Sequence, residues 1–460
     1  MDAIDTFLNR ISTAGDSVAL HHAGVEYSYA QLMRSADRWF SQMEECGIRP
    51  GAVCAFVGDY SLDTCSLILA LIRARAIFAP LTPAVKGELS TFLSIAGVEF
   101  LIDPPSPTGV YITRTGVSCE NPLIRSFRAT DSAGLVVFTS GSTGAPKGIL
   151  HSCERVLRKF IRAREPHRTL LFLLMDHFGG LNTLLGVFAN GGVGICPHGR
   201  SPAAICEAIE RGRATLLPTT PTFLNLLTTS GVYQGHDLSS VKLITYGTEV
   251  MSDSTLQRVR ESFPNAELKQ TYGLSELGVL RSKSEGSTST FVRLGGAGFE
   301  VKIVEDTIWV RSEANMIGYL NAPSPFDSDG WFCTGDKVEQ KDGFLRILGR
   351  ESDVINVGGQ KVFPVEVETV LCGADNVRDA VVRSAAHRLL GAVVHATVTL
   401  VRPEEPASVR ERLRRHCAGL LARYKVPVTI EIVENMDVTG RYKKQRGRTA
   451  PSEASDSVSG

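Results

Sequence analysis

The sequence predicts an α/β protein: a large amino-terminal domain of mostly parallel sheets covered by helices, with a small antiparallel region, and a small α+β carboxy-terminal domain. Apolar runs suited to buried strands alternate with helix-like stretches, a rhythm typical of parallel sheets. The character of the chain changes after Gly349, where a second and shorter set of elements begins. At 460 residues the chain is also longer than one ordinary domain.

Strands of the large domain are expected where short apolar runs occur, because a fully buried strand needs no polar alternation. These runs cover 52–57, 77–81, 98–102, 170–174, 216–217 and 243–246, and the stretch 65–75 has the character of a helix. The segments 301–311 and 344–348 are short and bounded by turns. We expect them to form the antiparallel region that closes the large domain.

The small domain is predicted from the order of its elements. These are a loop, a helix at 365–371, strands at 380–383 and 392–400, a helix at 408–423 and a strand at 428–433. Together they make a unit of common domain size. We therefore divide the chain into domains at 1–349 and 350–446, followed by a serine-rich tail at 447–460 that is expected to be disordered.

Composition argues against several classes of protein. Lysine plus arginine equals aspartate plus glutamate at 49 each, without long blocks of one sign, so no nucleic-acid-binding surface is expected. The longest apolar runs are too short to span a bilayer, and the amino terminus does not resemble a secretory signal. Ten cysteines occur singly, without a C-x-x-C pair. This pattern predicts reduced thiols in a cytoplasmic protein without structural zinc.

The strongest local pattern follows the apolar run 135–138. Its residues are Thr139, Ser140, Gly141, Ser142, Thr143, Gly144, Ala145, Pro146, Lys147 and Gly148. The glycines permit close backbone approach and positive φ, while the hydroxyl and N–H groups donate hydrogen bonds. A phosphate-binding loop is therefore predicted. It is not a Walker loop, because Pro146 precedes the lysine and Gly148 follows it.

This segment resembles the phosphate loop of the adenylate-forming superfamily, which includes acyl-CoA synthetases, aryl-acid ligases, peptide-synthetase adenylation domains and luciferases. Further segments occur in the superfamily's order between about residues 30 and 446. The resemblance implies that Thr139 and Lys147 bind ATP and that Thr139 also serves catalysis.

A second segment resembles the superfamily's Tyr-Gly-x-Thr-Glu motif. It reads Gln270, Thr271, Tyr272, Gly273, Leu274, Ser275 and Glu276. The resemblance implies that Tyr272 stacks near adenine, that Ser275 touches phosphate in place of the usual threonine, and that Glu276 helps to hold magnesium. Because ATP is a tetra-anion, it needs a hard cation with oxygen ligands, which a single carboxylate and phosphate oxygens supply.

Two shorter segments complete the expected nucleotide site. Thr248 and Glu249, after Tyr246 and Gly247, resemble the loop whose backbone lies against adenine, although relatives usually have Gly-Gly-Glu or Gly-Ala-Glu there. The segment 331–336, which ends at Asp336, resembles the superfamily segment whose aspartate accepts hydrogen bonds from both ribose hydroxyls. A carboxylate, with two acceptor oxygens, suits a vicinal diol.

The longest match covers 349–368. The resemblance implies that Arg350 contacts ribose and that Ser352, where relatives have Asp or Lys, is the hinge of a mobile carboxy-terminal domain. It also implies that Gly358, Gly359 and Lys361 belong to the loop that lines a tunnel for the thiol.

Near the end of the chain, 439–446 resembles the superfamily's Thr-x-x-Gly-Lys-x-x-Arg motif. This register aligns Lys443 with the catalytic lysine and retains both the threonine and the arginine, although Tyr442 stands where relatives carry glycine. Lys444 and Arg441 remain alternative functional cations.

The acid pocket is expected around 172–181. This segment resembles the one in which acyl-CoA and aryl-acid ligases carry a histidine at the pocket entrance, so His177 is a candidate gate for the carboxylate. A purely structural histidine is the alternative. The other pocket candidates are Phe178, Gly179, Leu181, Thr248 and Gly273.

These parts imply an ATP- and Mg²⁺-dependent, AMP-forming carboxylic acid ligase. The acid forms acyl-AMP and pyrophosphate, and the acyl group then passes to the thiol of CoA or of phosphopantetheine on an acyl carrier protein. No G-x-S-x-G nucleophile elbow is present, and none is needed when AMP is the leaving group. One alternative has an amine or another nucleophile as acceptor, and another is a nucleotide-binding regulatory homologue without turnover.

Overall fold

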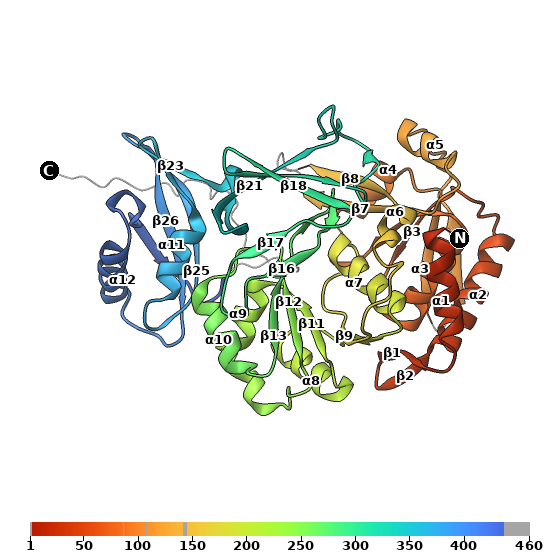
Figure 1. The fold of residues 1–460 in the computed structure, drawn as a ribbon, viewed down its shortest axis with the longest axis horizontal. Helices are drawn as coiled ribbons and strands as arrows, with labels where there is room; N and C mark the ends of the chain where they lie inside the picture. The colour runs from red at the N-terminus through yellow and green to blue at the C-terminus, as the bar shows by residue number, and fades with distance from the viewer. Residues whose placement is uncertain (1, 86, 107–108, 141–144, 437–460) are drawn as a thin grey trace.

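The computed structural model describes residues 2–85, 87–106, 109–140 and 145–436 of the chain. A large body carries a smaller carboxy-terminal unit at one end, opposite the amino terminus (Figure 1). The predicted tail, 447–460, lies outside the described residues. No helix of the described ranges is long and apolar enough to cross a membrane.

The large body contains two seven-stranded sheets. The first has a parallel centre of β5, β3, β4 and β7, flanked by antiparallel partners. In spatial order its strands are β20 (Gly318–Tyr319), β8 (Pro146–Ser152), β7 (Gly134–Ser140), β4 (Ile77–Leu81), β3 (Val53–Val57), β5 (Phe100–Ser106) and β6 (Gly109–Arg114).

The second sheet is parallel except at one edge, where β1 and β2 form a hairpin. In spatial order its strands are β13 (Glu267–Gln270), β12 (Leu243–Tyr246), β11 (Leu216–Thr219), β9 (Arg168–Leu170), β10 (Val193–Cys196), β1 (Val18–His22) and β2 (Val25–Ser28). The predicted α/β class with mostly parallel sheets is thus confirmed.

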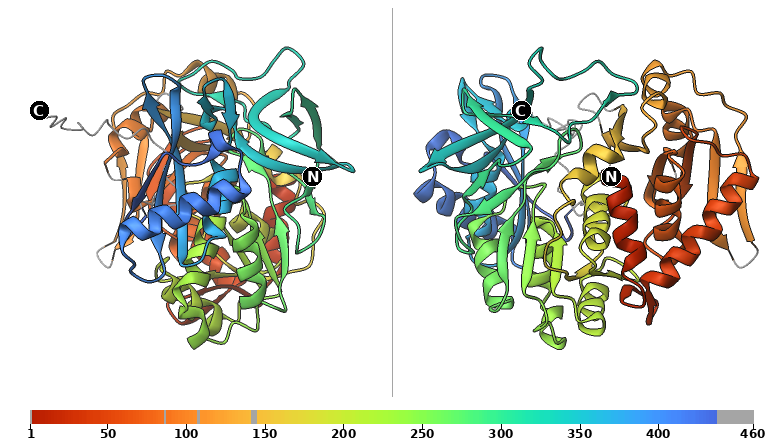
Figure 2. Two further views of the ribbon diagram at one scale, coloured as in Figure 1. Left: turned by 90° about the vertical axis from the view of Figure 1, so that its left-hand side faces the viewer. Right: turned by 45° about the vertical axis from the view of Figure 1, so that its right-hand side comes forward.

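Helices fill the space between the two sheets and cover their outer faces. Their bounds are α1 (Ala3–Thr13), α2 (Tyr29–Glu45), α3 (Leu62–Arg73), α4 (Leu89–Ala96), α5 (Pro122–Arg128), α6 (Cys153–Arg158), α7 (Phe178–Ala189), α8 (Pro202–Gly212), α9 (Pro221–Ser230) and α10 (Asp253–Ser262). One apolar core joins α1, α2, α3 and α7 to both sheets; in Figure 2 (right), red α1 and yellow α7 lie between orange and green strands. Capping boxes at Ser28 and Ser61 fix where α2 and α3 begin.

A six-stranded antiparallel sheet closes the large body, as the segments 301–311 and 344–348 predict. Its strands are β16 (Ser282–Ser284), β17 (Val292–Leu294), β22 (Phe344–Arg350), β21 (Phe332–Lys341), β19 (Thr307–Ser312) and β18 (Phe299–Val304), and a short hairpin of β14 (Gly273–Leu274) and β15 (Gly278–Val279) precedes it. Exposed positions alternate with less exposed ones along β18 and the first part of β21, as in a sheet with one solvated face.

The carboxy-terminal unit has its own apolar core. Its elements are β23 (Ile355–Val357), β24 (Gln360–Val362), α11 (Pro364–Cys372), β25 (Val377–His387), β26 (Gly391–Leu400), α12 (Pro406–Leu420) and β27 (Thr429–Ile432). The unit meets the large body beside α9, where the side-chain amide of Asn225 donates a hydrogen bond to the carbonyl of Arg378 at 3.1 Å.

One expected strand is shorter than its apolar run. The run 170–174 predicts a strand, but β9 ends at Leu170. The carbonyls of Phe172 and Leu173 accept hydrogen bonds from Arg200 and from the hydroxyl of Tyr60 instead of a neighbouring strand. The segment after Leu170 is apolar because part of it packs into the apolar core and part lines a cleft, not because it continues the sheet.

Candidate active site

A cleft of about 460 Å³ lies between the second sheet, the β7–β8 hairpin and the first turn of α7. Its volume is within the usual range for small-molecule sites. The cleft brings together predicted residues from five separate segments: Thr139, Lys147, His177, Phe178, Gly179, Thr248, Thr271, Tyr272, Gly273, Ser275, Glu276 and Arg350.

The β7–β8 hairpin presents Thr139 and Lys147 side by side. The two residues are direct partners across the antiparallel strands, one register step from Ser140 and Pro146. The Nζ of Lys147 lies 4.9 Å from the centre of the Tyr319 ring. The other loop residues predicted to bind phosphate, Gly141, Ser142, Thr143 and Gly144, lie outside the described residues.

Glu276 is held in the cleft by a residue that no motif indicates. The hydroxyl of Tyr319, on β20, donates a hydrogen bond to Oε1 of Glu276 at 2.7 Å. Burial, followed by the charge of Glu276, raises the pKa of Tyr319, so the hydroxyl keeps its proton and remains a donor.

The side chains that line the cleft suit magnesium better than a metal that needs three or more histidine, cysteine or acidic ligands. Among the described residues, no group of three histidine, cysteine or acidic side chains could hold a metal ion. Among the described residues that line the cleft, Glu276 is the single carboxylate. Magnesium is commonly bound by one or two carboxylates together with phosphate oxygens and water.

Asp336 lies just behind the cleft and is 7% exposed. The hydroxyl of Tyr272 donates a hydrogen bond to Oδ2, and Nε of Arg350 lies 3.4 Å from Oδ1. Asp336 and Arg350 face each other because β21 and β22 pair them. Burial raises the pKa of Asp336 even though both partners favour its charged form. Each carboxylate oxygen can still accept another hydrogen bond, as a ribose hydroxyl would require.

The backbone of the segment 271–276 is fixed by a buried histidine. Nε2 of His151 on β8 lies 2.6 Å from the carbonyl oxygen of Ser275. Burial lowers the pKa of His151 to about 4, so the ring is neutral near pH 7. Since a carbonyl only accepts, Nε2 carries the proton and donates it.

The loop expected to lie against adenine is strained. Thr248 has a φ of 70°, an uncommon conformation for a β-branched residue. A Cβ atom at Gly247 would come within 2.5 Å of Thr271 Oγ1, so the loop passes close to the segment 271–276. Glu249 does not line the cleft; its Oε2 accepts a hydrogen bond from the backbone of Thr222 at the start of α9.

His177 immediately precedes α7 and lines the cleft. Its Nε2 is 3.8 Å from Oδ1 of Asp176. Asp176 is buried, and its Oδ2 accepts a hydrogen bond from the hydroxyl of Thr82. The first turn of α7 packs tightly, since a Cβ atom at Gly180 would lie 2.0 Å from the carbonyl oxygen of Leu174. Leu181, expected in the pocket, belongs to the apolar core instead.

Arg200 is a second cleft residue that the motifs do not indicate. Its guanidinium makes a bidentate contact with Asp59, with distances of 2.5 and 2.9 Å, and its Nε donates to the carbonyl of Phe172. This arrangement fixes the wall of the cleft at Phe172, and the Asp59 carboxylate offsets the charge of the guanidinium.

Among the described residues of the predicted carboxy-terminal domain, Arg350 lines the cleft, whereas the predicted hinge and thiol-tunnel residues do not. Gly358 and Gly359 form the turn between β23 and β24, with φ values of 55° and 90°, and Lys361 is exposed on β24. Ser352 lies in a short 3-10 helix directly after β22. Lys443 lies outside the described residues.

The two layered sheets, the closing antiparallel sheet and a cleft that gathers the motif residues are the arrangement expected of an adenylate-forming enzyme. The chain belongs to the AMP-binding enzyme family, whose sequence model matches residues 7–320. The model of the AMP-binding enzyme C-terminal domain matches residues 366–443.

Known relatives align with nearly the whole chain. A feruloyl-CoA synthase from Amycolatopsis sp is 27% identical, with 96% of both chains covered. An indoleacetate–CoA ligase from Aromatoleum aromaticum is 26% identical, with 92% of both covered. The solved structure of the amide bond synthetase McbA from Marinactinospora thermotolerans is 25% identical with a TM-score of 0.78, covering 95% of this chain and 97% of that one. The chain is accordingly an AMP-forming acid ligase.

Proposed function

We propose that the cleft activates an aromatic carboxylic acid with ATP and passes the acyl group to CoA. The observation that carries this proposal is the glycine wall of the cleft, formed by Gly179, Gly247 and Gly273. A Cβ atom at Gly273 would lie 2.7 Å from the carbonyl oxygen of Gly278, so this position of the wall has room for backbone only. A flat ring can approach such a wall closely. The names of the two CoA-ligase relatives also denote aromatic acids.

In the first half-reaction a carboxylate oxygen attacks the α-phosphorus of ATP. The new bond gives acyl-AMP, and the bond to the β-phosphate oxygen breaks to release pyrophosphate. Two anions must meet, so charge neutralisation is the main task of the site. A lysine about 4 Å from the reacting oxygens contributes on the order of 4 kcal/mol at an effective dielectric near 20.

We assign this task to Lys147 at the phosphates and Lys443 at the reacting carboxylate. Magnesium bound at Glu276 would supply further neutralisation of the phosphate charge. Thr139 donates to phosphate beside Lys147, and His177 guides the carboxylate at the pocket entrance. Arg350 and Asp336 hold the ribose hydroxyls.

In the second half-reaction the CoA thiolate attacks the acyl carbonyl, and AMP leaves with the electron pair of the former acyl–oxygen bond. We propose that the carboxy-terminal unit rotates about Ser352 between the two steps. In this structure the turn at Gly358 and Gly359 does not line the cleft. This supports a pose different from the one in which the acyl group passes to the thiol. A carrier-protein phosphopantetheine would present the same thiol.

An amine acceptor is the second candidate. It is supported by the likeness to an amide bond synthetase over nearly the whole chain. Acyl-AMP reacts readily with amines, so the first half-reaction and its residues are unchanged. We place either reaction in the cytoplasm, in keeping with ten free cysteines.

Pyrophosphate release tests the proposal. Purified protein is incubated with ATP, Mg²⁺ and a panel of aryl, fatty and amino acids, with CoA, with an amine or with neither acceptor. Mass spectrometry then identifies acyl-AMP, thioester or amide. Aryl acids should give the highest kcat/KM and CoA the thioester. Release confined to fatty or amino acids would overturn the aromatic assignment, and amide without thioester would favour the second candidate.

A further inference from the structure

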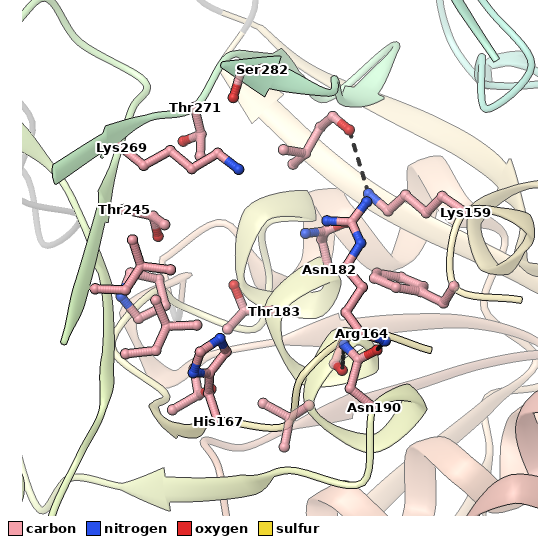
Figure 3. Close-up of a pocket in the computed structure, with 18 of the residues that line it drawn as sticks. Lys159, Arg164, His167, Asn182, Thr183, Asn190, Thr245, Lys269, Thr271 and Ser282 are labelled. Carbon is pink, nitrogen blue, oxygen red and sulfur yellow. Dashed lines mark hydrogen bonds between the residues drawn. The ribbon is translucent and has the colours of Figure 1, made fainter. Parts of the chain in front are cut away.

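A second cavity, of about 590 Å³, continues from the cleft along α7 (Figure 3). The two share the lining residues Asn182, Thr183, Pro218, Thr245, Thr271 and Val279. A substrate whose carboxylate lies in the cleft could therefore extend its other end into this cavity, past the amide of Asn182 and the hydroxyl of Thr183.

The walls of the second cavity carry an excess of positive charge. Four cationic side chains line it, namely Lys159, Arg164, Lys269 and Arg281, against a single acid, Glu165. Figure 3 shows the ammonium groups of Lys159 and Lys269 directed toward the cavity from opposite walls, with the guanidinium of Arg164 beside Lys159. Within the described part of the chain, none of these four cations forms an ion pair.

Lys159 is the most informative of them. Its Nζ donates to the carbonyl oxygen of Val279 at 3.5 Å and lies 5.0 Å from the Phe160 ring, and neither contact neutralises its charge. Burial, followed by the charges of Arg164 and Arg281, lowers the pKa of Lys159 to about 7. Uncompensated positive charge in a partly enclosed cavity is costly, and an anion placed there would remove that cost.

We propose that this cavity binds a carboxylate at the far end of the acid substrate, so that the enzyme's preferred substrates are dicarboxylic acids. The inference rests on the proposed function, since it names the substrate class of the same site. One carboxylate reacts with ATP in the cleft. The other is held between Lys159 and Lys269, with hydroxyl donors such as Thr245 and Ser282 on the same lining. A carboxylate can accept about four hydrogen bonds, which several converging donors would satisfy.

The test compares acids that differ only at the far end. Phenylbutyrate is paired with its para-carboxyl derivative and octanoate with the corresponding terminal dicarboxylate, and kcat/KM is measured from pyrophosphate release. The wild-type enzyme should prefer the dicarboxylate of at least one pair by about tenfold or more. A ratio near one, or a preference for the monocarboxylate in both pairs, would overturn the inference.

Variants then locate the preference. Lys159→Gln and, on the opposite wall, Lys269→Gln should each lower the dicarboxylate preference about tenfold and change kcat/KM for the monocarboxylates little. Lys242→Gln replaces an exposed lysine outside the cavity and should leave the preference intact. An unchanged preference in both cavity variants would place the recognition elsewhere and overturn the proposal. Failure of the proposed aromatic assignment has another signature, because pyrophosphate release would then be confined to the octanoate pair, whereas the dicarboxylate preference is measured within each pair.

Discussion

The hydroxyl of Tyr319 donates a hydrogen bond to Oε1 of Glu276 at 2.7 Å, while the ring of the same tyrosine lies 4.9 Å from the ammonium of Lys147. One side chain thus touches both a cation suited to phosphate and a carboxylate suited to magnesium. The contact depends on β20 pairing with β8 at Ile149, which places Tyr319 beside the phosphate-loop hairpin.

Tyr319→Phe should lower kcat/KM for ATP about tenfold, because a hydrogen bond to a charged group is worth about 1.5–3 kcal/mol and here orients Glu276. The ring and its contact with Lys147 are retained. Pyrophosphate release at varied ATP measures the effect, and Tyr233→Phe, outside the cleft, is the matched control. Equal activity of wild type and Tyr319→Phe would show that Glu276 needs no orientation by this hydroxyl.

Glu276→Gln and Asp336→Asn should separate the metal and ribose roles. Removing the Glu276 charge should raise the Mg²⁺ concentration needed for half-maximal turnover. Asp336→Asn should instead raise KM for ATP about tenfold, because it removes one acceptor oxygen and weakens the contacts with Tyr272 and Arg350. ATP titrations at several Mg²⁺ concentrations distinguish these responses. An identical response from both variants contradicts the two assignments.

The dicarboxylate preference should depend on pH through Lys159. The free enzyme holds this proton below about pH 7 and loses it above, since its pKa is lowered from 10.5 to about 7. The ratio of kcat/KM for paired dicarboxylic and monocarboxylic acids should therefore be highest below pH 7 and fall as pH rises, because kcat/KM reports the free enzyme. The other titratable or charged side chains on the cavity lining are Arg164, Glu165, His167, Lys269 and Arg281.

Lys159→Gln serves as the control for this pH dependence. The ratio should become nearly independent of pH in the variant, whereas the pH profile for the monocarboxylic acid alone should not change. A fall that persists without Lys159 would assign the titration to another group and contradict the role of Lys159.

Lys443→Ala should lower acyl-AMP formation by about a hundredfold to a thousandfold, as expected for the loss of about 3–4 kcal/mol of transition-state stabilisation. Lys444→Ala is the matched control and should do far less. The measurement is pyrophosphate exchange in the absence of CoA. Damage by Lys444→Ala with a benign Lys443→Ala would shift the carboxy-terminal register by one residue.

Contiguous motifs predicted much of the site, and distant contacts explain what they missed. Thr139, Lys147, Tyr272 and Glu276 stand in short segments whose residue types and spacing indicate nucleotide chemistry, and the structure brings them to one cleft. Tyr319, His151 and Arg200 act through partners 43, 124 and 141 residues away in the sequence. Such pairs arise from strand pairing and sheet stacking, so no local pattern marks them.

The fold was predictable where buried strands are continuously apolar, as in β3 and β4. The strand expected at 170–174 was too long because an apolar segment that packs in the core and lines a cleft has the same composition as a buried strand. Leu181 was expected in the pocket for a related reason. On α7 a pocket leucine and a core leucine differ only in which face of the helix they occupy, and a resemblance does not supply that orientation.

The proposed two-pose cycle is tested in the turn at Gly359. Gly359→Leu should leave pyrophosphate exchange near the wild-type rate and lower thioester formation more than tenfold, because the side chain obstructs only the pose in which this turn faces the cleft. Leucine is also strained at a φ of 90°, so a control must carry similar strain. Gly391→Leu does so, since Gly391 has a φ of 74°, belongs to the same unit and likewise has no atom within 4 Å of a built Cβ. Loss of both half-reactions in Gly359→Leu, with Gly391→Leu active and both variants folded by circular dichroism, would contradict the rotation about Ser352 and favour a fixed site.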